Sequence, residues 1–128
     1  MSKTKYLLEF DMMGTPPSLL WMYVATPSGL DQWFADKVEQ DGKKFMFYWD
    51  KYPTEAVQLS ACSGERVKFR WVEEEDKSYF EFKISVSEFN GHTMLTVIDF
   101  AEDGEEDESK ALWNKQLKVL KRKLGCKW

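Results

Sequence analysis

The sequence predicts an α+β fold in which a curved antiparallel sheet of seven strands packs with a long C-terminal helix. Two patterns predict it. Short alternating segments separated by turn residues extend to about residue 100, and a helical repeat of apolar residues follows from about residue 109. A chain of 128 residues is too short for two ordinary domains, so a single domain over residues 1–128 is expected. The aromatic content of 16% requires a folded core.

The N-terminal part predicts one strand and two short helices. Residues 6–12 alternate between large apolar and more polar side chains, which is typical of a half-buried strand. Residues 15–18, Thr-Pro-Pro-Ser, predict the start of a helix, because proline is compatible with the first turn. Residues 26–28, Thr-Pro-Ser, predict a second start that leads to Leu30, Trp33 and Phe34.

Six further strands follow, separated by turn signals of which Asp41-Gly42 and Asn90-Gly91 are the strongest. The predicted strands are residues 37–41, 44–50, 55–62, 66–72, 79–88 and 93–100. Tight hairpin turns would pair residues across these strands and so define an inner face. The predicted inner pairs are Val38–Phe45, Val67–Ile84, Phe69–Phe82, Trp71–Phe80, Phe82–Asp99, Ile84–Val97 and Val86–Leu95.

The strand over 55–62 leaves two alternatives open. A two-residue turn at Ser63-Gly64 places Gln58 and Ser60 inside and leaves Val57 and Leu59 outside. A β-bulge in this strand would reverse that assignment, because one extra residue exchanges the two faces.

The last part of the chain predicts a loop and a long helix. Residues 102–108 hold six acidic residues and one glycine, which is typical of a solvated loop before a helix. From Ser109 onward, one stripe carries the apolar residues Trp113, Leu117, Leu120 and Leu124, and basic residues lie elsewhere. Acidic residues before the helix and basic residues along it favour its macrodipole.

Composition excludes several function classes. The net charge of −4 argues against general binding of nucleic acid or anionic membranes. No apolar run is long enough for a signal peptide or a membrane helix, so a cytoplasmic protein without membrane insertion is expected. Cys62, Cys126 and the single His92 form no convincing zinc or disulfide pattern, so two free cysteines and no metal or cofactor are expected.

The order of elements resembles the helix-grip fold of the START-like (Bet v 1-like) superfamily, and most closely its activator-of-Hsp90-ATPase-like branch. The residues that carry the resemblance are Pro17 to Trp21, Thr26 to Phe34, Arg66 to Trp71, Thr93 to Val97, and Trp113 with Leu117 and Leu120. These motifs specify packing and turns rather than a reaction.

The resemblance implies a sheet that grips the C-terminal helix around a cavity for a small apolar molecule such as a lipid. The function expected on this basis is hydrophobic ligand binding. The predicted cavity wall consists of Phe10, Trp33, Phe45, Phe47, Trp49, Phe69, Trp71, Phe80, Phe82, Val97, Asp99, Trp113, Leu117 and Leu120. The same rings are also compatible with an ordinary filled core.

Asp99 is the most informative polar residue, because the predicted register places its carboxylate on the apolar inner face. It is either a polar anchor or acid at the cavity wall, or a strand-end residue without a chemical role. Gln58 or Gln116 are further candidates to orient a ligand, and the C-terminal helix or residues 27–34 would move to admit it. No catalytic residue is assigned, because His92 lacks a nucleophile partner.

A second hypothesis is a protein-interaction or co-chaperone-like module with a filled core and no physiological ligand. Met94, Ile98 and Phe100 fall on the predicted outer face, where three large apolar side chains would suit a homodimer or a protein partner. The alternative is that the first strand and the acidic loop cover them.

Overall fold

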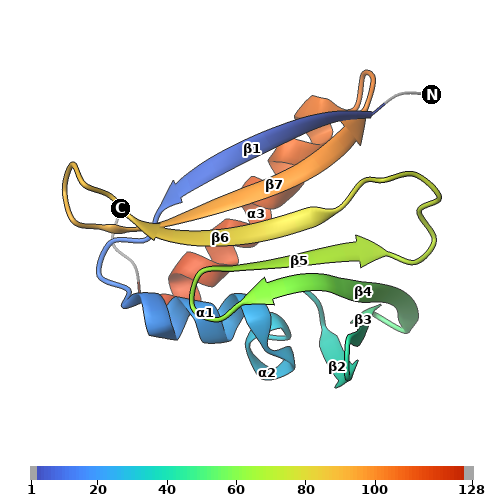
Figure 1. Cartoon of the computed structure of the whole chain (residues 1–128), viewed down its shortest axis with the longest axis horizontal. Coiled ribbons are helices and arrows are strands. Elements are labelled where there is room, and N and C mark those ends of the chain that lie inside the picture. The colour runs from blue at the N-terminus through green and yellow to red at the C-terminus, as the bar shows by residue number, and fades with distance from the viewer. Residues whose placement is uncertain (1–2, 126–128) are drawn as a thin grey trace.

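The computed structural model describes residues 3–125 and confirms the α+β fold (Figure 1). Seven strands and three helices follow the expected order. Their bounds are β1 (Lys3–Asp11), α1 (Pro17–Ala25), α2 (Pro27–Leu30), β2 (Lys37–Asp41), β3 (Lys44–Trp49), β4 (Tyr52–Cys62), β5 (Arg66–Trp71), β6 (Phe80–Val86), β7 (Thr93–Glu102) and α3 (Glu106–Leu124).

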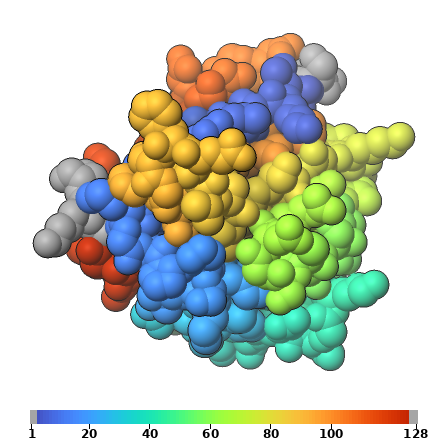
Figure 2. All heavy atoms as spheres, turned by 60° about the vertical axis from the view of Figure 1, so that its left-hand side comes forward, coloured from blue at the N-terminus to red at the C-terminus, as the bar shows by residue number. Residues whose placement is uncertain are grey.

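The strands form one antiparallel sheet in the order β1-β7-β6-β5-β4-β3-β2. β1 and β2 are therefore the two edges, and the chain crosses between them through α1 and α2. The sheet curves around α3, which runs along its inner face (Figure 1). Figure 2 views the end of the molecule where α1 lies in front, beside the connections β4–β5 and β6–β7. In the part of the chain described, no helix is long and apolar enough to cross a membrane.

The predicted hairpin pairings are wrong by two residues in three hairpins, although the inner face is right. Phe82 pairs with Val97 rather than Asp99, and Ser87 to His92 form a six-residue connection instead of a two-residue turn. The observed partners are Phe47 for Val38, Phe82 for Val67, Phe80 for Phe69, Leu95 for Ile84 and Thr93 for Val86. The pairing of β5 with β6 ends at Phe69 and Phe80, before it reaches Trp71. A shift of two preserves the face, because side chains alternate with a period of two.

Strand β4 contains a β-bulge between Gln58 and Ser60. Gln58 lies opposite the buried Phe69, as the tight-turn alternative predicted, whereas Ser60 lies opposite Lys68 on the outer face, contrary to it. The extra residue at the bulge is Leu59, which is 47% exposed. The bulge therefore exchanges the faces only for the part of the strand after it.

Several boundaries also differ from the predicted ones. β4 begins at Tyr52 instead of the predicted residue 55. The turn before it contains Asp50 in the left-handed region (φ 58°), so Tyr52 and Pro53 belong to the strand and not to the turn. α3 begins at Glu106, so three of the acidic residues form its first turn, where they favour the helix dipole. Gly125 ends α3 in the left-handed conformation (φ 72°).

Candidate functional site

The space between the sheet and α3 is filled by aromatic and aliphatic side chains. Most predicted wall residues are buried there, whereas Phe10, Trp49, Trp71 and Asp99 are half-buried. The buried ones are Trp33, Phe45, Phe47, Phe69, Phe80, Phe82, Val97, Trp113, Leu117 and Leu120. The structure thus brings the predicted residues together, and the rings pack mainly on one another.

Phe34, which the sequence did not assign to this wall, lies at its centre. Its ring is nearly parallel to those of Trp71 (13°, centroids 6.4 Å apart) and Trp113 (17°, 5.7 Å). It also packs edge-on against Phe47 and Trp49. The sequence placed Phe34 in the helical segment that starts at residue 26, but gave no information on where this segment docks.

The backbone of Phe34 is held by hydrogen bonds from three elements. Its N–H donates to the carbonyl of Leu30 at the end of α2 (2.9 Å). Its carbonyl accepts from Trp49 Nε1 in β3 (3.0 Å) and from Gln116 Nε2 in α3 (3.2 Å). The neighbouring Trp33 donates from Nε1 to the carbonyl of Tyr23 in α1 (2.7 Å). The segment after α2 is therefore latched to the sheet and to both adjacent helices.

A surface groove of about 540 Å³ lies over this latch, between the segment after α2 and helix α3. Its lining residues are Asp31, Gln32, Trp33, Phe34, Ala35, Asp36, Trp49, Lys115, Gln116 and Val119. Three of the rings that fill the interior therefore also border this groove. Gln116 was a predicted polar candidate and lines it, whereas Asp99 and Gln58 do not.

Asp99 lies on the inner side of β7 and is tied to helix α3. Trp113 Nε1 donates to Asp99 Oδ2 (2.8 Å), and the N–H of Phe100 donates to Oδ1 (2.7 Å). Burial raises the pKa of Asp99, and these two hydrogen bonds act in the opposite direction. The carboxylate thus has a polar partner on the helix, so its inward position does not leave it unsatisfied.

Tyr6 lies opposite Asp99 in the pairing of β1 with β7. Its hydroxyl forms a hydrogen bond with Ser109 Oγ on α3. Burial, more than any other cause, raises the pKa of Tyr6 to about 12. Tyr6 and Asp99 therefore join the sheet to α3 through two polar contacts, one with Ser109 and one with Trp113.

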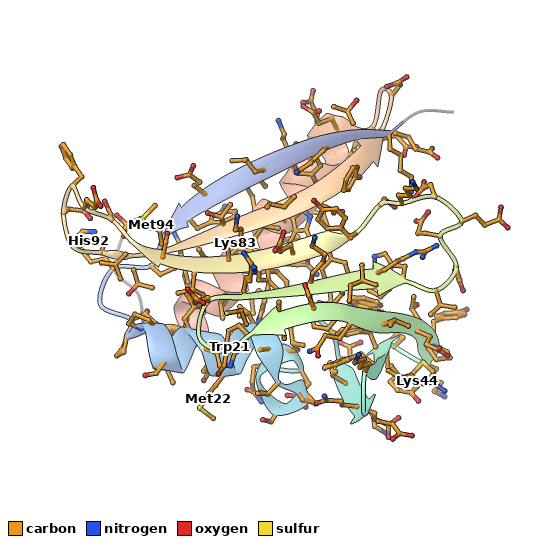
Figure 3. The ribbon with its side chains drawn as sticks, viewed as in Figure 1. Trp21, Met22, Lys44, Lys83, His92 and Met94 are labelled. Atoms are coloured by element: carbon orange, nitrogen blue, oxygen red, sulfur yellow. The ribbon has the colours of Figure 1, made fainter. Side chains whose placement is uncertain are left out.

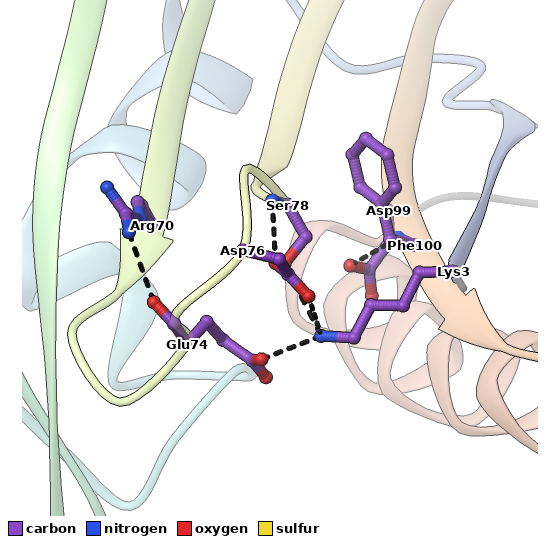
Figure 4. Close-up of polar contacts among 7 residues, drawn as sticks. All are labelled: Lys3, Arg70, Glu74, Asp76, Ser78, Asp99 and Phe100. Carbon is purple, nitrogen blue, oxygen red and sulfur yellow. Dashed lines mark hydrogen bonds and ion pairs between the residues drawn. The ribbon is translucent and has the colours of Figure 1, made fainter. Parts of the chain in front are cut away.

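Lys3 anchors the β5–β6 loop to the edge strand (Figure 4). Its ammonium lies 2.6 Å from Glu74 Oε2 and 3.2 Å from Asp76 Oδ2. Hydrogen bonds from the side chain and backbone of Ser78, followed by the contact with Lys3, lower the pKa of Asp76 to about 2. A second groove, of about 490 Å³, lies beside Lys3. Its other lining residues are Glu74, Phe100, Ala101, Glu102, Glu105, Glu108, Ser109 and Leu112.

His92 and Cys62, the other residues considered from the sequence, each contact an acidic side chain. His92 Nδ1 lies 2.9 Å from Asp11 Oδ2, at the end of the sheet where Figure 3 labels His92. Cys62 donates its thiol to Glu65 Oε2 (2.6 Å), and Cys126 lies outside the described residues. Among residues 3–125, no group of three His, Cys, Asp or Glu side chains is arranged to hold a metal ion.

The predicted outer apolar trio is largely covered. Ile98 is only 6% exposed and lies between Leu7 of β1 and Glu81 of β6. Phe100 packs edge-on against Tyr79, with centroids 5.0 Å apart. The edge strand and the residue before β6 thus shield much of the apolar surface.

Comparison with known families agrees with this architecture, because the model of the START-like superfamily domain matches residues 1–126. The chain belongs to the START-like superfamily. No curated protein matches it. The solution structure of BfR322 from Bacteroides fragilis is 37% identical and has a TM-score of 0.69; the match covers 96% of this chain and 92% of that one.

Solved structures of lower sequence identity share the fold. The Aha1 dimer from Colwellia psychrerythraea is 13% identical, with a TM-score of 0.75 over 97% of this chain and 96% of that one. DynU16, a protein of the dynemicin biosynthetic locus, is 19% identical, with a TM-score of 0.76 over 96% of this chain and 47% of that one. At these identities the likeness shows the fold alone.

Proposed function

We propose that this START-like domain binds a small apolar molecule in the groove beside Phe34 and in the ring-filled space behind it. Members of the superfamily bind hydrophobic ligands. The observation that carries the proposal is the groove of about 540 Å³, whose lining includes Trp33, Phe34 and Trp49; Trp33 and Phe34 are only 6% and 4% exposed in it. Its volume is in the range of small-molecule sites, about 300–1,000 Å³.

The ligand occupies the groove and takes the place of the Phe34 ring between Trp71 and Trp113. The flat faces of these two indoles favour a planar or aromatic apolar molecule. Gln116 and the carbonyl of Phe34 line the same groove and offer a donor and an acceptor to one polar end of the ligand. The remaining apolar residues of the predicted wall supply the surface behind them.

Admission of the ligand requires the segment after α2 to move. The movement breaks the bonds from Trp49 and Gln116 to the Phe34 carbonyl. Each such bond contributes roughly 0.5–1.5 kcal/mol. The Phe34 ring also leaves the interior, which costs about 1.5–3 kcal/mol, and burial of the ligand in its place offsets this cost. Residues 27–34 therefore form the gate in this proposal, whereas α3 stays in place.

The test is a titration with the uncharged fluorescent probe N-phenyl-1-naphthylamine. We expect saturable binding by the unaltered protein and tighter binding by Phe34→Ala, which vacates the space between the two indoles. Val119→Trp fills the groove from α3 and should abolish binding. Leu112→Trp makes the same kind of change on α3 outside this groove, so it should bind as the unaltered protein does. Equal binding by both tryptophan variants, or none by Phe34→Ala, contradicts the proposal.

The packed interior favours a second candidate function, an interaction module without a ligand. Helix α1 is apolar on all sides and leaves Met22 54% and Leu19 39% exposed, as expected of a surface that a partner covers. Sedimentation velocity over a concentration range distinguishes self-association from a monomer. A monomer that retains the probe favours the ligand function alone.

A further inference from the structure

The outer face of the sheet carries four basic residues, of which only Lys68 has an acidic residue, Glu81, as its cross-strand neighbour. Arg66 and Lys68 on β5, Lys83 on β6 and Lys5 on β1 point away from α3, and Figure 3 shows Lys83 on this side. Within the described residues, none of these four forms an ion pair. This is unexpected in a chain that has 22 acidic residues against 18 basic ones. We name these four residues the outer basic face.

Two of these cations are placed against each other. Arg66 and Lys83 are direct partners in the pairing of β5 with β6. Like charges directly opposite one another destabilise an antiparallel pair. The opposed pair of Arg66 and Lys83 costs stability, and no ion pair within the described residues compensates for it. Such a pair indicates a surface that serves binding.

The hollow between these two cations has an apolar floor. It measures about 330 Å³, and its lining includes Arg66, Lys83, Leu7 and Ile98. Leu7 is 53% exposed, whereas its cross-strand neighbour Ile98 is buried. The hollow thus offers two positive groups to a carboxylate and a contact surface to an apolar side chain next to it.

The outer basic face continues around Tyr79. The ammonium of Lys68 lies 4.2 Å from the centroid of this ring, and that of Lys5 lies 5.9 Å from it. Farther along β5, Arg70 Nε is a buried donor without an acceptor in the described part of the chain. Arg66, Lys68 and Arg70 occupy alternate positions of one strand, so their spacing along it is about 6.6 Å.

We propose that the outer basic face binds an extended acidic segment of another protein, with acidic residues at alternate positions. The spacing of two residues along β5 equals that of alternate side chains on an extended partner. The carboxylates of that segment face Arg66 with Lys83 and then Lys68 with Lys5, and an apolar side chain enters the hollow.

Acidic groups around the outer basic face limit where the carboxylates of a partner can bind. Glu81 is buried between Lys68 and Ile98, and Glu65 lies at the rim of the hollow. Glu9 and Asp11 follow Leu7 at alternate positions on the outer side of β1. The positive charge is therefore concentrated on β5 and β6, and the partner's carboxylates must lie there rather than over the second half of β1. The arrangement favours a peptide over single-stranded nucleic acid, because Lys68 covers the Tyr79 ring on which a base would stack.

The test is fluorescence anisotropy with labelled peptides of equal composition. One peptide has glutamate at every second position, with serines and one leucine between them, and the other has its glutamates in one block. We expect the alternating peptide to bind more tightly and its affinity to fall with added salt. Replacing both Arg66 and Lys83 by Gln should weaken its binding about five- to tenfold.

The matched control replaces Lys118 and Lys123, two exposed cations of α3, by Gln and should change the affinity less than twofold. Thermal unfolding should show Arg66→Gln/Lys83→Gln to be at least as stable as the unaltered protein, because the opposed charges are removed. Three results would overturn the proposal: no binding of the alternating peptide, equal loss in the control variant, or tighter binding of an oligothymidylate that the Arg66 and Lys83 changes weaken.

Discussion

Trp113 donates its indole N–H to the carboxylate of Asp99 over 2.8 Å and so joins helix α3 to strand β7. The bond crosses an interface that is built mainly from rings and aliphatic groups, and the Tyr6–Ser109 hydrogen bond is a second polar contact there. It explains how an acidic residue lies on the inner face of the sheet, since the helix supplies the donor that burial requires. Asp99 thereby positions the helix over the sheet.

Replacing Asp99 by Asn should change the pH dependence of stability. Burial raises the pKa of Asp99 in the folded protein above the ordinary value of 3.8 for an aspartate side chain. The folded state therefore holds this proton more tightly, and the associated stability is lost as the pH rises from about 3.8 through the raised pKa. Urea unfolding at successive pH values should show Asp99→Asn gaining stability relative to the unaltered protein over this window. A difference that is constant with pH contradicts the assignment.

Replacing Trp113 by Phe should raise the pKa of Asp99 further. The substitution removes the donor to Oδ2 but keeps an aromatic ring in the core. We expect a loss of about 1–3 kcal/mol in the free energy of unfolding, because a buried acceptor loses its partner. An NMR titration of the Asp99 carboxyl carbon measures the pKa directly, and an unchanged value would show that the bond is not formed in solution.

Tyr6 should resist ionisation at alkaline pH. Its pKa of about 12 lies above the ordinary value of 10.0, because burial disfavours the phenolate. The neutral form is favoured in the folded state, so stability is lost as the pH rises between about 10 and about 12. Comparison of the ultraviolet titrations of the unaltered protein and Tyr6→Phe isolates this residue. A difference that titrates near 10 would argue against its burial.

Phe34→Ala should cost about 3–5 kcal/mol of the free energy of unfolding, since it removes a ring enclosed by other rings. The matched control is Phe89→Ala, because Phe89 is 98% exposed in the β6–β7 connection and should contribute within about 0.5 kcal/mol. Chemical denaturation measures both variants. Similar losses for the two would mean that Phe34 does not fill the interior.

Gly29→Ala should destabilise the contact between α1 and α2. An added Cβ would lie 1.9 Å from the carbonyl oxygen of Met22 and 2.5 Å from Tyr23 Cα, both of them backbone atoms that cannot easily yield. The expected loss is about 3 kcal/mol or more. Gly64→Ala serves as comparison: its φ of +79° costs about 1–2 kcal/mol, but no atom lies within 4 Å of the new Cβ. Thermal unfolding should therefore rank Gly29→Ala as the less stable variant.

The sequence predicts the elements and the inner face better than it predicts pairing. Alternation along a strand is local, so Phe45, Phe69 and Phe82 are assigned to the inside from their positions alone. The register depends on the length of each connection, which hydrogen bonds such as Ser87 N–H to the His92 carbonyl decide. The sequence left a bulge in β4 open as one of two alternatives, because a period of two cannot decide where that period is interrupted.

In the candidate site, too, some residues could be predicted from the sequence and others could not. Gln116 and Trp33 could be predicted because helical spacing and apolar patterning place them near the core. The central position of Phe34 could not, since it depends on donors from Trp49 and Gln116, which lie 15 and 82 residues away along the chain. The outer basic face likewise results from strand order, which sets β5 beside β6 and β1 beside β7.

By itself, the sequence determined that aromatic side chains cover one face of a sheet and that an amphipathic helix follows, because both are periodic features of neighbouring residues. The tertiary structure alone decided that the ring of Phe34 packs in the interior, nearly parallel to those of Trp71 and Trp113. The physical reason is that α2 docks through hydrogen bonds between residues distant in the chain, and local periodicity carries no information about such contacts.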